Sequence, residues 1–148
     1  MGVFPVRPQH VLVNEYQPGQ GIDAHRDGPL YEPRVAILSL GSHATFEFLR
    51  NDGGRACLSS LLIPARGLLV FADGAYSEHL HRVTAVSVDE LGESTIRLGE
   101  ASAPALRRIR RVSLTVRRVL QVRDTPSFVA AGLSAAPPDQ DEHIDIPT

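Results

Sequence analysis

The chain has 148 residues, 43% of them hydrophobic, which suits one domain whose core rests mainly on Leu, Val, Ile and Ala. All fifteen basic residues are arginine, and Cys57 is the single cysteine. This excludes enzymes that need a Walker-A or Schiff-base lysine, intrachain disulfides and cysteine-rich zinc sites. The formal net charge of −2 excludes a strongly basic protein of the kind that binds nucleic acid by charge alone.

Strand-like segments dominate the chain, with turn signals between them. Short runs rich in Val, Ile, Leu and Phe, bounded by Gly and Pro, are typical of strands. The pattern predicts strands over His10–Tyr16, Arg34–Leu40, Ala44–Leu49, Leu58–Ile63, Gly67–Phe71, His81–Val88 and Ile109–Val119, with turns at 41–43 and 64–66. No stretch keeps a 3.6-residue period, so we expect a mainly β fold, an antiparallel sandwich or barrel.

Two segments do not fit this pattern. Residues 88–107 lack periodicity and are predicted to form a long loop. Residues 124–148 combine Ala, Pro and five acidic residues without arginine, so we expect a disordered acidic tail after a core domain at 1–123. The sequence has no apolar run of bilayer length and no leader at Met1, so we expect a cytoplasmic or nuclear protein without membrane contact.

Polar residues stand at even spacing within several strand-like segments. Side chains two residues apart on a strand point to the same face. Asn14 and Tyr16 form one such pair, and His25 and Asp27 form another. A longer set comprises Arg111, Ser113, Thr115 and Arg117. All of them could therefore converge inside one small barrel.

His25 and Asp27 could supply half of a metal site. Iron(II) in oxygenases is bound by two histidines and one carboxylate on one face of the ion. The second histidine must come from a later strand, and His81 is the candidate because it opens an alternating run, with His79 as the alternative. A His-x-Asp pair alone is common by chance. We expect the remaining histidines to have ordinary roles: His10, His43 and His143.

The arginines of the last strand have two possible placements. If Val112, Leu114 and Val116 pack in the core, Arg111 and Arg117 are surface charges, and alternation alone favours this placement. If the polar face lines the barrel, two buried guanidinium groups need a dianion, such as a dicarboxylic acid, to neutralise them.

Taken together, these motifs resemble the AlkB-like family of iron(II)/2-oxoglutarate dioxygenases. The resemblance covers about Pro8 to Val119 and rests on five separated places: Val11–Tyr16, Gly21–Tyr31, Ser39–His43, His81 and Arg111–Arg117. It implies a double-stranded β-helix, which is a jelly-roll-like barrel. It also implies that the polar face of the last strand lines the interior.

The resemblance also implies roles for individual residues. Fe(II) would be bound by His25, Asp27 and His81, which are then the catalytic residues. The cofactor 2-oxoglutarate would be bound by Asn14, Tyr16, Arg111 and Arg117. Arg111 and Tyr16 would hold its distal carboxylate, while Arg117 and Asn14 would lie near the end that chelates the metal. The implied activity is oxidative demethylation of N-alkylated nucleic acid, with dioxygen as the co-substrate and the target base single-stranded or flipped out.

The sequence departs from the family pattern at three places. The family has an N-terminal region with lid segments, whereas Met1 stands just before the first motif strand, so we expect truncation at the N-terminus. Arg82 follows the distal histidine where glycine is common, and Ser113 replaces a frequent asparagine. Two alternatives therefore stay open: a non-catalytic module that binds iron and 2-oxoglutarate, and an oxygenase that acts on a protein side chain.

Overall fold

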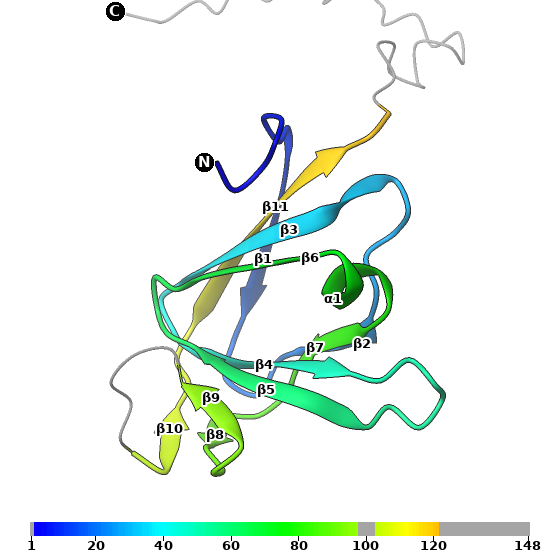
Figure 1. The fold of residues 1–148 in the computed structure, drawn as a ribbon. Coiled ribbons are helices and arrows are strands. Elements are labelled where there is room, and N and C mark those ends of the chain that lie inside the picture. The colour runs from blue at the N-terminus through cyan, green and yellow to red at the C-terminus, as the bar shows by residue number, and fades with distance from the viewer. Residues whose placement is uncertain (1, 98–102, 122–148) are drawn as a thin grey trace, which may run out of the picture.

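The protein is built almost entirely from β-strands, which form two facing sheets and a separate two-stranded sheet of β8 and β10 (Figure 1). The computed structural model describes residues 2–97 and 103–121. Its elements are β1 (His10–Tyr16), β2 (Ile22–His25), β3 (Tyr31–Leu40), β4 (Ala44–Leu49), β5 (Cys57–Ile63), β6 (Leu68–Ala72), α1 (Gly74–Ser77), β7 (Leu80–Val83), β8 (Val88–Glu90), β9 (Thr95–Arg97), β10 (Ala105–Arg107) and β11 (Arg111–Val119). The predicted mainly β, jelly-roll-like fold is confirmed.

The chain passes from one sheet to the other at sharp corners. One sheet has the strand order β1-β11-β3-β6, and the other has the order β2-β7-β4-β5-β9. The two predicted turns, at 41–43 and 64–66, join β3 to β4 and β5 to β6, and each carries the chain between sheets. Gly41 has a φ of +83°, a left-handed conformation that glycine adopts without strain.

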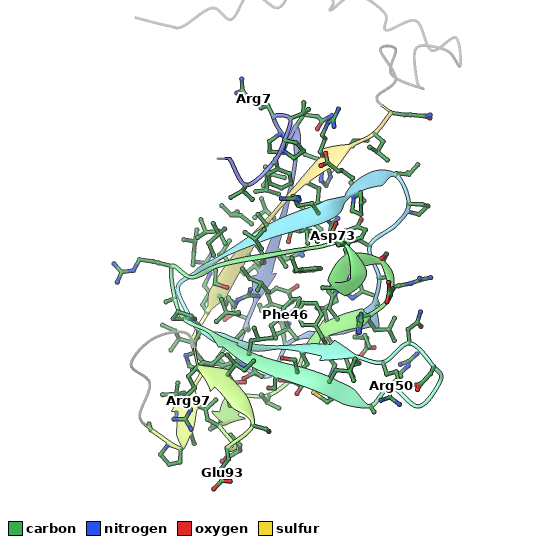
Figure 2. The ribbon with its side chains drawn as sticks, viewed as in Figure 1. Arg7, Phe46, Arg50, Asp73, Glu93 and Arg97 are labelled. Atoms are coloured by element: carbon green, nitrogen blue, oxygen red, sulfur yellow. The ribbon has the colours of Figure 1, made fainter. Side chains whose placement is uncertain are left out.

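Aliphatic and aromatic side chains fill the space between the sheets. Buried core residues come from both: Val35, Ile37, Ala44, Phe46, Ile63, Leu69, Phe71, Tyr76 and Val83. Figure 2 shows Phe46 at the centre of the molecule, between the sheets. Burying each larger apolar side chain contributes about 1.5–3 kcal/mol, so a few large residues compensate for the absence of tryptophan.

The last long strand, β11, lies between β1 and β3 and determines which groups face the interior. In the β1–β11 register, Asn14 is opposite Ser113 and Tyr16 is opposite Arg111. Directly opposite residues share one face of a sheet. Ser113 and Arg111 are both buried, so this face is the inner one.

The structure corrects two predicted segments. Residues 88–107 are not one long loop, because β8, β9 and β10 lie within them. These strands have three residues each, too few to show an alternating pattern. The predicted strand His81–Val88 is interrupted after Val83, where the carbonyl oxygen of Thr84 accepts a hydrogen bond from Arg108 instead of continuing a strand ladder.

Three further predictions concern the end of β2, the C-terminal tail and membrane-spanning segments. β2 ends at His25, so Asp27 lies just beyond the strand and not within it. The predicted acidic tail at 124–148 lies outside the described residues. Within the described ranges, no helix is long and apolar enough to cross a membrane.

Candidate active site

A cavity opens between the two sheets. Its volume is about 70 Å³. Apolar side chains from both sheets form part of its wall: Leu12, Ile22, Ile37, Phe46 and Val83. Its polar lining comprises all of the site residues predicted from the sequence, together with Ser113 and Thr115: Asn14, Tyr16, His25, Asp27, His81, Arg111 and Arg117.

Three of these residues form a cluster suited to a metal ion. The candidate ligand atoms of His25, Asp27 and His81 all lie within 4.8 Å of one another. His25 on β2 is directly opposite His81 on β7, and their ring centroids are 4.4 Å apart. The structure therefore brings together the predicted pair and the predicted third ligand from three separate positions in the sequence.

The protonation state of His81 and the hydrogen bond of His25 fit metal binding. Burial, with smaller contributions from His25 and Arg117, lowers the pKa of His81 to about 3, so its imidazole is neutral at physiological pH. The Nδ1 atom of His25 lies 2.7 Å from the Asp23 carbonyl oxygen and donates to it, so Nε2 is the ring nitrogen left to face a metal. Neutral imidazole is the form that binds metals.

Unsatisfied polar atoms provide an independent test of the fit. His81 Nδ1 and Asp27 Oδ2 are buried and have no hydrogen-bond partner within the described structure. A buried polar atom without a partner costs about 1–3 kcal/mol unless a ligand satisfies it. Two histidines and one carboxylate match the ligand set of non-haem iron(II).

Beside this cluster, β11 turns a row of polar side chains inward. Arg111, Ser113, Thr115 and Arg117 are buried, so the placement favoured by alternation alone is wrong and the interior placement is correct. Alternation fails here because Val112, Leu114 and Val116 form part of the half-exposed outer face of the sheet.

Arg111 is a buried cation without a carboxylate partner among residues 2–97 and 103–121. Its Nε and Nη2 atoms donate to Ser39 Oγ at 3.2 and 2.9 Å, and its Cζ lies 5.4 Å from the centroid of the Tyr16 ring. Burial, with Arg108 nearby, lowers its pKa, but a guanidinium stays protonated in proteins. Such a group is a binding site for an anion in the cavity.

Arg117 differs from Arg111 because it is already paired. Its Nη2 atom lies 2.7 Å from Asp27 Oδ1, and the two side chains are only 10% and 5% exposed. Its Cζ lies 4.8 Å from the centroid of the Tyr31 ring, and its Nε has no described partner. One oxygen of Asp27 therefore binds the arginine, and the other remains available to a metal.

Comparison with known proteins agrees with this geometry. Residues 2–117 match the family model of the 2OG-Fe(II) oxygenase superfamily. The chain belongs to this superfamily. Fe(II) and 2-oxoglutarate, the cofactors expected from the sequence, are the ones that define it.

Several relatives of this chain are named as AlkB homologues. It is 39% identical over 127 residues to a protein of Danio rerio named probable RNA/DNA demethylase ALKBH6, a match that covers 76% of the chain and 54% of the relative. It is 32% identical over 94 residues to a Macaca fascicularis protein named tRNA (carboxymethyluridine(34)-5-O)-methyltransferase ALKBH8, covering 63% of the chain and 14% of the relative. The chain thus spans about half the length of ALKBH6 and much less of ALKBH8.

A solved structure of OsALKBH1 has the same fold. The TM-score is 0.54 at 23% sequence identity, and the match covers 78% of the oxygenase chain and 50% of the solved one. This likeness supports the jelly-roll-like architecture.

The alternative metal ligand, His79, does not join the cluster. β7 begins at Leu80, after His79, whose Nδ1 lies 2.9 Å from the Gly74 carbonyl oxygen. His10 packs against the Tyr31 ring at a centroid distance of 5.4 Å. Neither residue belongs to the metal cluster of the described structure.

A second buried polar cluster lies outside the cavity and has no counterpart in the sequence predictions. Arg108 donates two hydrogen bonds of 2.6 Å to Asp89, and His43 Nε2 lies 3.3 Å from the same carboxylate. Burial alone would raise the pKa of Asp89, but the hydrogen bonds and the positive charge of Arg108 outweigh it, and the net pKa is lowered. This cluster fastens the segment between β7 and β11 to the start of β4.

Sequence reasoning also missed three residues that support the site. Ser39 holds Arg111, Tyr31 packs against Arg117, and the Tyr76 hydroxyl donates to the Gly28 carbonyl oxygen at 3.3 Å, next to Asp27. Ser39 did carry a signal, because it continues the inward-facing positions of an otherwise apolar strand.

Proposed function

We propose that this chain is the catalytic core of an Fe(II)/2-oxoglutarate-dependent dioxygenase that demethylates N-alkylated nucleic acid by oxidation. The observation that supports it best is the presence, in one cavity, of a two-histidine, one-carboxylate cluster and a buried arginine without a carboxylate partner in the described part of the chain. The first suits iron, and the second suits the carboxylate of a co-substrate.

The proposed roles are assigned to residues that line the cavity. His25, Asp27 and His81 bind iron. Arg111 and Tyr16 bind the distal carboxylate of 2-oxoglutarate, and Arg117 and Asn14 lie near its metal-chelating end. When bound, iron and 2-oxoglutarate supply the oxidation: dioxygen is consumed, 2-oxoglutarate becomes succinate and carbon dioxide, and a substrate C–H becomes C–OH. A hydroxylated N-methyl group then leaves as formaldehyde.

The protein itself contributes orientation and the exclusion of water. Leu12, Ile37 and Phe46 form an apolar wall, and charge interactions are stronger when water is excluded. Asp27 keeps Arg117 in place, so one cationic group stands next to the metal ligands before any ligand binds.

The substrate is proposed from the relatives and from charge. One relative is named a probable RNA/DNA demethylase, and another is named for a tRNA modification. Residues 1–123 carry all fifteen arginines and twelve acidic residues, a balance compatible with a polyanionic partner. The alkylated base would be single-stranded or flipped out of its stack to reach the cavity. A cytoplasmic or nuclear location belongs to this proposal and can be checked with a fluorescent fusion.

The test measures succinate from the purified chain with Fe(II), ascorbate, 2-oxoglutarate and air, with and without N-methylated single-stranded oligonucleotides. We expect succinate and formaldehyde in equal amounts when the oligonucleotide is present, and neither product from Asp27→Asn. Succinate without formaldehyde would contradict the nucleic-acid substrate and favour a protein side chain. Bound cofactors without succinate would favour the non-catalytic module.

A further inference from the structure

The position of the Arg111 guanidinium is determined by its neighbours on β3. Arg111 precedes Val112, which pairs with Leu40 of β3, so Arg111 lies level with Gly41 at the end of that strand. A Cβ on Gly41 would lie 2.5 Å from the Arg110 carbonyl oxygen, so this corner has no room for a side chain. The Arg111 side chain instead reaches Ser39, which is 0% exposed.

Ser39 holds one particular edge of the guanidinium. Its Oγ accepts hydrogen bonds from Nε and from Nη2 of Arg111, the two nitrogens on the side of the group. Arginine has five N–H donors, and three remain, two on Nη1 and one on Nη2. Nη1 and Nη2 form the end of the group, which is the fork that binds a carboxylate through two hydrogen bonds.

Ser39 is itself fixed. Its N–H donates to the Gly67 carbonyl oxygen at 3.0 Å, and its carbonyl oxygen accepts from the Arg66 N–H at 2.7 Å. Both partners belong to the corner between β5 and β6. These bonds fix the backbone of Ser39, so its hydroxyl can follow Arg111 only by a change of side-chain rotamer.

We propose that Ser39 is a positioning residue of the 2-oxoglutarate site: its Oγ orients Arg111 so that the Nη1–Nη2 edge receives the distal carboxylate. This inference rests on the role proposed above for Arg111. Ser39 acts through the arginine and does not bind the co-substrate itself. Its effect is specific to ligands that carry a distal carboxylate.

The test compares two ligands by isothermal titration calorimetry of the full chain loaded with Mn²⁺. The first ligand is 2-oxoglutarate. The second is 2-oxopentanoate, which has the same keto-acid end and no distal carboxylate. We expect Ser39→Ala to raise the Kd of 2-oxoglutarate about tenfold and to leave the Kd values of 2-oxopentanoate and Mn²⁺ unchanged. Ser39→Thr keeps the hydroxyl and should restore tight binding.

Two further variants keep the test decisive. Ser39→Cys fills nearly the same space with a weak acceptor, so it should reproduce the effect of Ser39→Ala if that variant fails to fold. Ser42→Ala is the matched control, because its buried hydroxyl accepts a hydrogen bond from the Ile109 N–H, whereas the described hydrogen bonds of Arg111 go to Ser39. We expect Ser42→Ala to bind both ligands as the parent does.

The outcomes separate this inference from the role of Arg111. Arg111→Gln should remove the preference for 2-oxoglutarate over 2-oxopentanoate. Suppose that it does so, while Ser39→Ala either retains the full preference or weakens the binding of both ligands equally. The inference about Ser39 is then overturned, and the role of Arg111 stands. If Arg111→Gln retains the preference, the assignment of Arg111 fails, and the inference fails with it.

Discussion

Removing the Asp27 carboxylate should destabilise the metal-free protein through Arg117. The ion pair joins them at 2.7 Å, and both side chains are almost fully buried. Breaking a buried pair by removing one partner costs about 3–5 kcal/mol, because the other charge is left without compensation. For Asp27→Ala we therefore expect the urea midpoint to fall by about 2–3 M, with a slope near 1.5 kcal/mol/M.

A double-mutant cycle identifies the cause. Arg117→Met keeps the straight side chain against Tyr31 and removes the charge. We expect the double variant Asp27→Ala/Arg117→Met to be more stable than Asp27→Ala, because no buried charge remains. The assay is urea unfolding of all four proteins, followed by circular dichroism with EDTA present. If the two single effects add to within about 0.5 kcal/mol, the pair is not coupled and the reasoning is refuted.

Three further predictions concern other parts of the site. Because the folded pKa of His81 is about 3 and its unfolded value is 6.5, only the unfolded chain takes up this proton as pH falls from 6.5. The free energy of unfolding should therefore drop by about 2.5 kcal/mol between pH 7 and pH 4.5. In His81→Leu, urea unfolding should show a drop between these pH values that is smaller by the same amount. Arg111→Gln should raise the Kd of 2-oxoglutarate about 100-fold and leave Mn²⁺ affinity unchanged in calorimetry, whereas equal losses would argue against the anion site. Gly41→Ala should cost about 2–4 kcal/mol, since φ is +83° and the new Cβ meets backbone; a loss below about 1 kcal/mol would contradict the corner geometry.

The local pattern of the sequence predicted much of the fold. Strands at His10–Tyr16 and Ala44–Leu49 match the structure at both ends, because apolar runs with turn residues on each side leave little ambiguity. The three-residue strands β8, β9 and β10 escaped prediction because their pairing depends on distant partners. Arg108 and Asp89, nineteen residues apart, hold this region together through a contact that no local pattern reveals.

The structure places the residues chosen from the sequence around one cavity, through contacts that the sequence did not predict. His25, Asp27 and His81 could be chosen from their residue types and spacing. The placement of Arg111 and Arg117 could not be decided from alternation, because the apolar side chains of β11 lie on its outer face and most of its polar side chains on the inner one. The pairing of Arg117 with Asp27 and of Arg111 with Ser39 depends on the register between strands, which only the folded structure provides.

The unequal pairing of the two arginines has a thermodynamic consequence for ligand binding. Arg117 is neutralised by Asp27, and Arg111 is not, so these two arginines and Asp27 together carry a formal charge of +1 before any ligand binds. A divalent metal makes this charge more positive, and a dianionic co-substrate then returns it to its starting value. Each ligand therefore makes the site more favourable for the other, and by linkage the two affinities change by the same factor. The metal-free, anion-free cavity is thus the state in which either ligand alone binds most weakly.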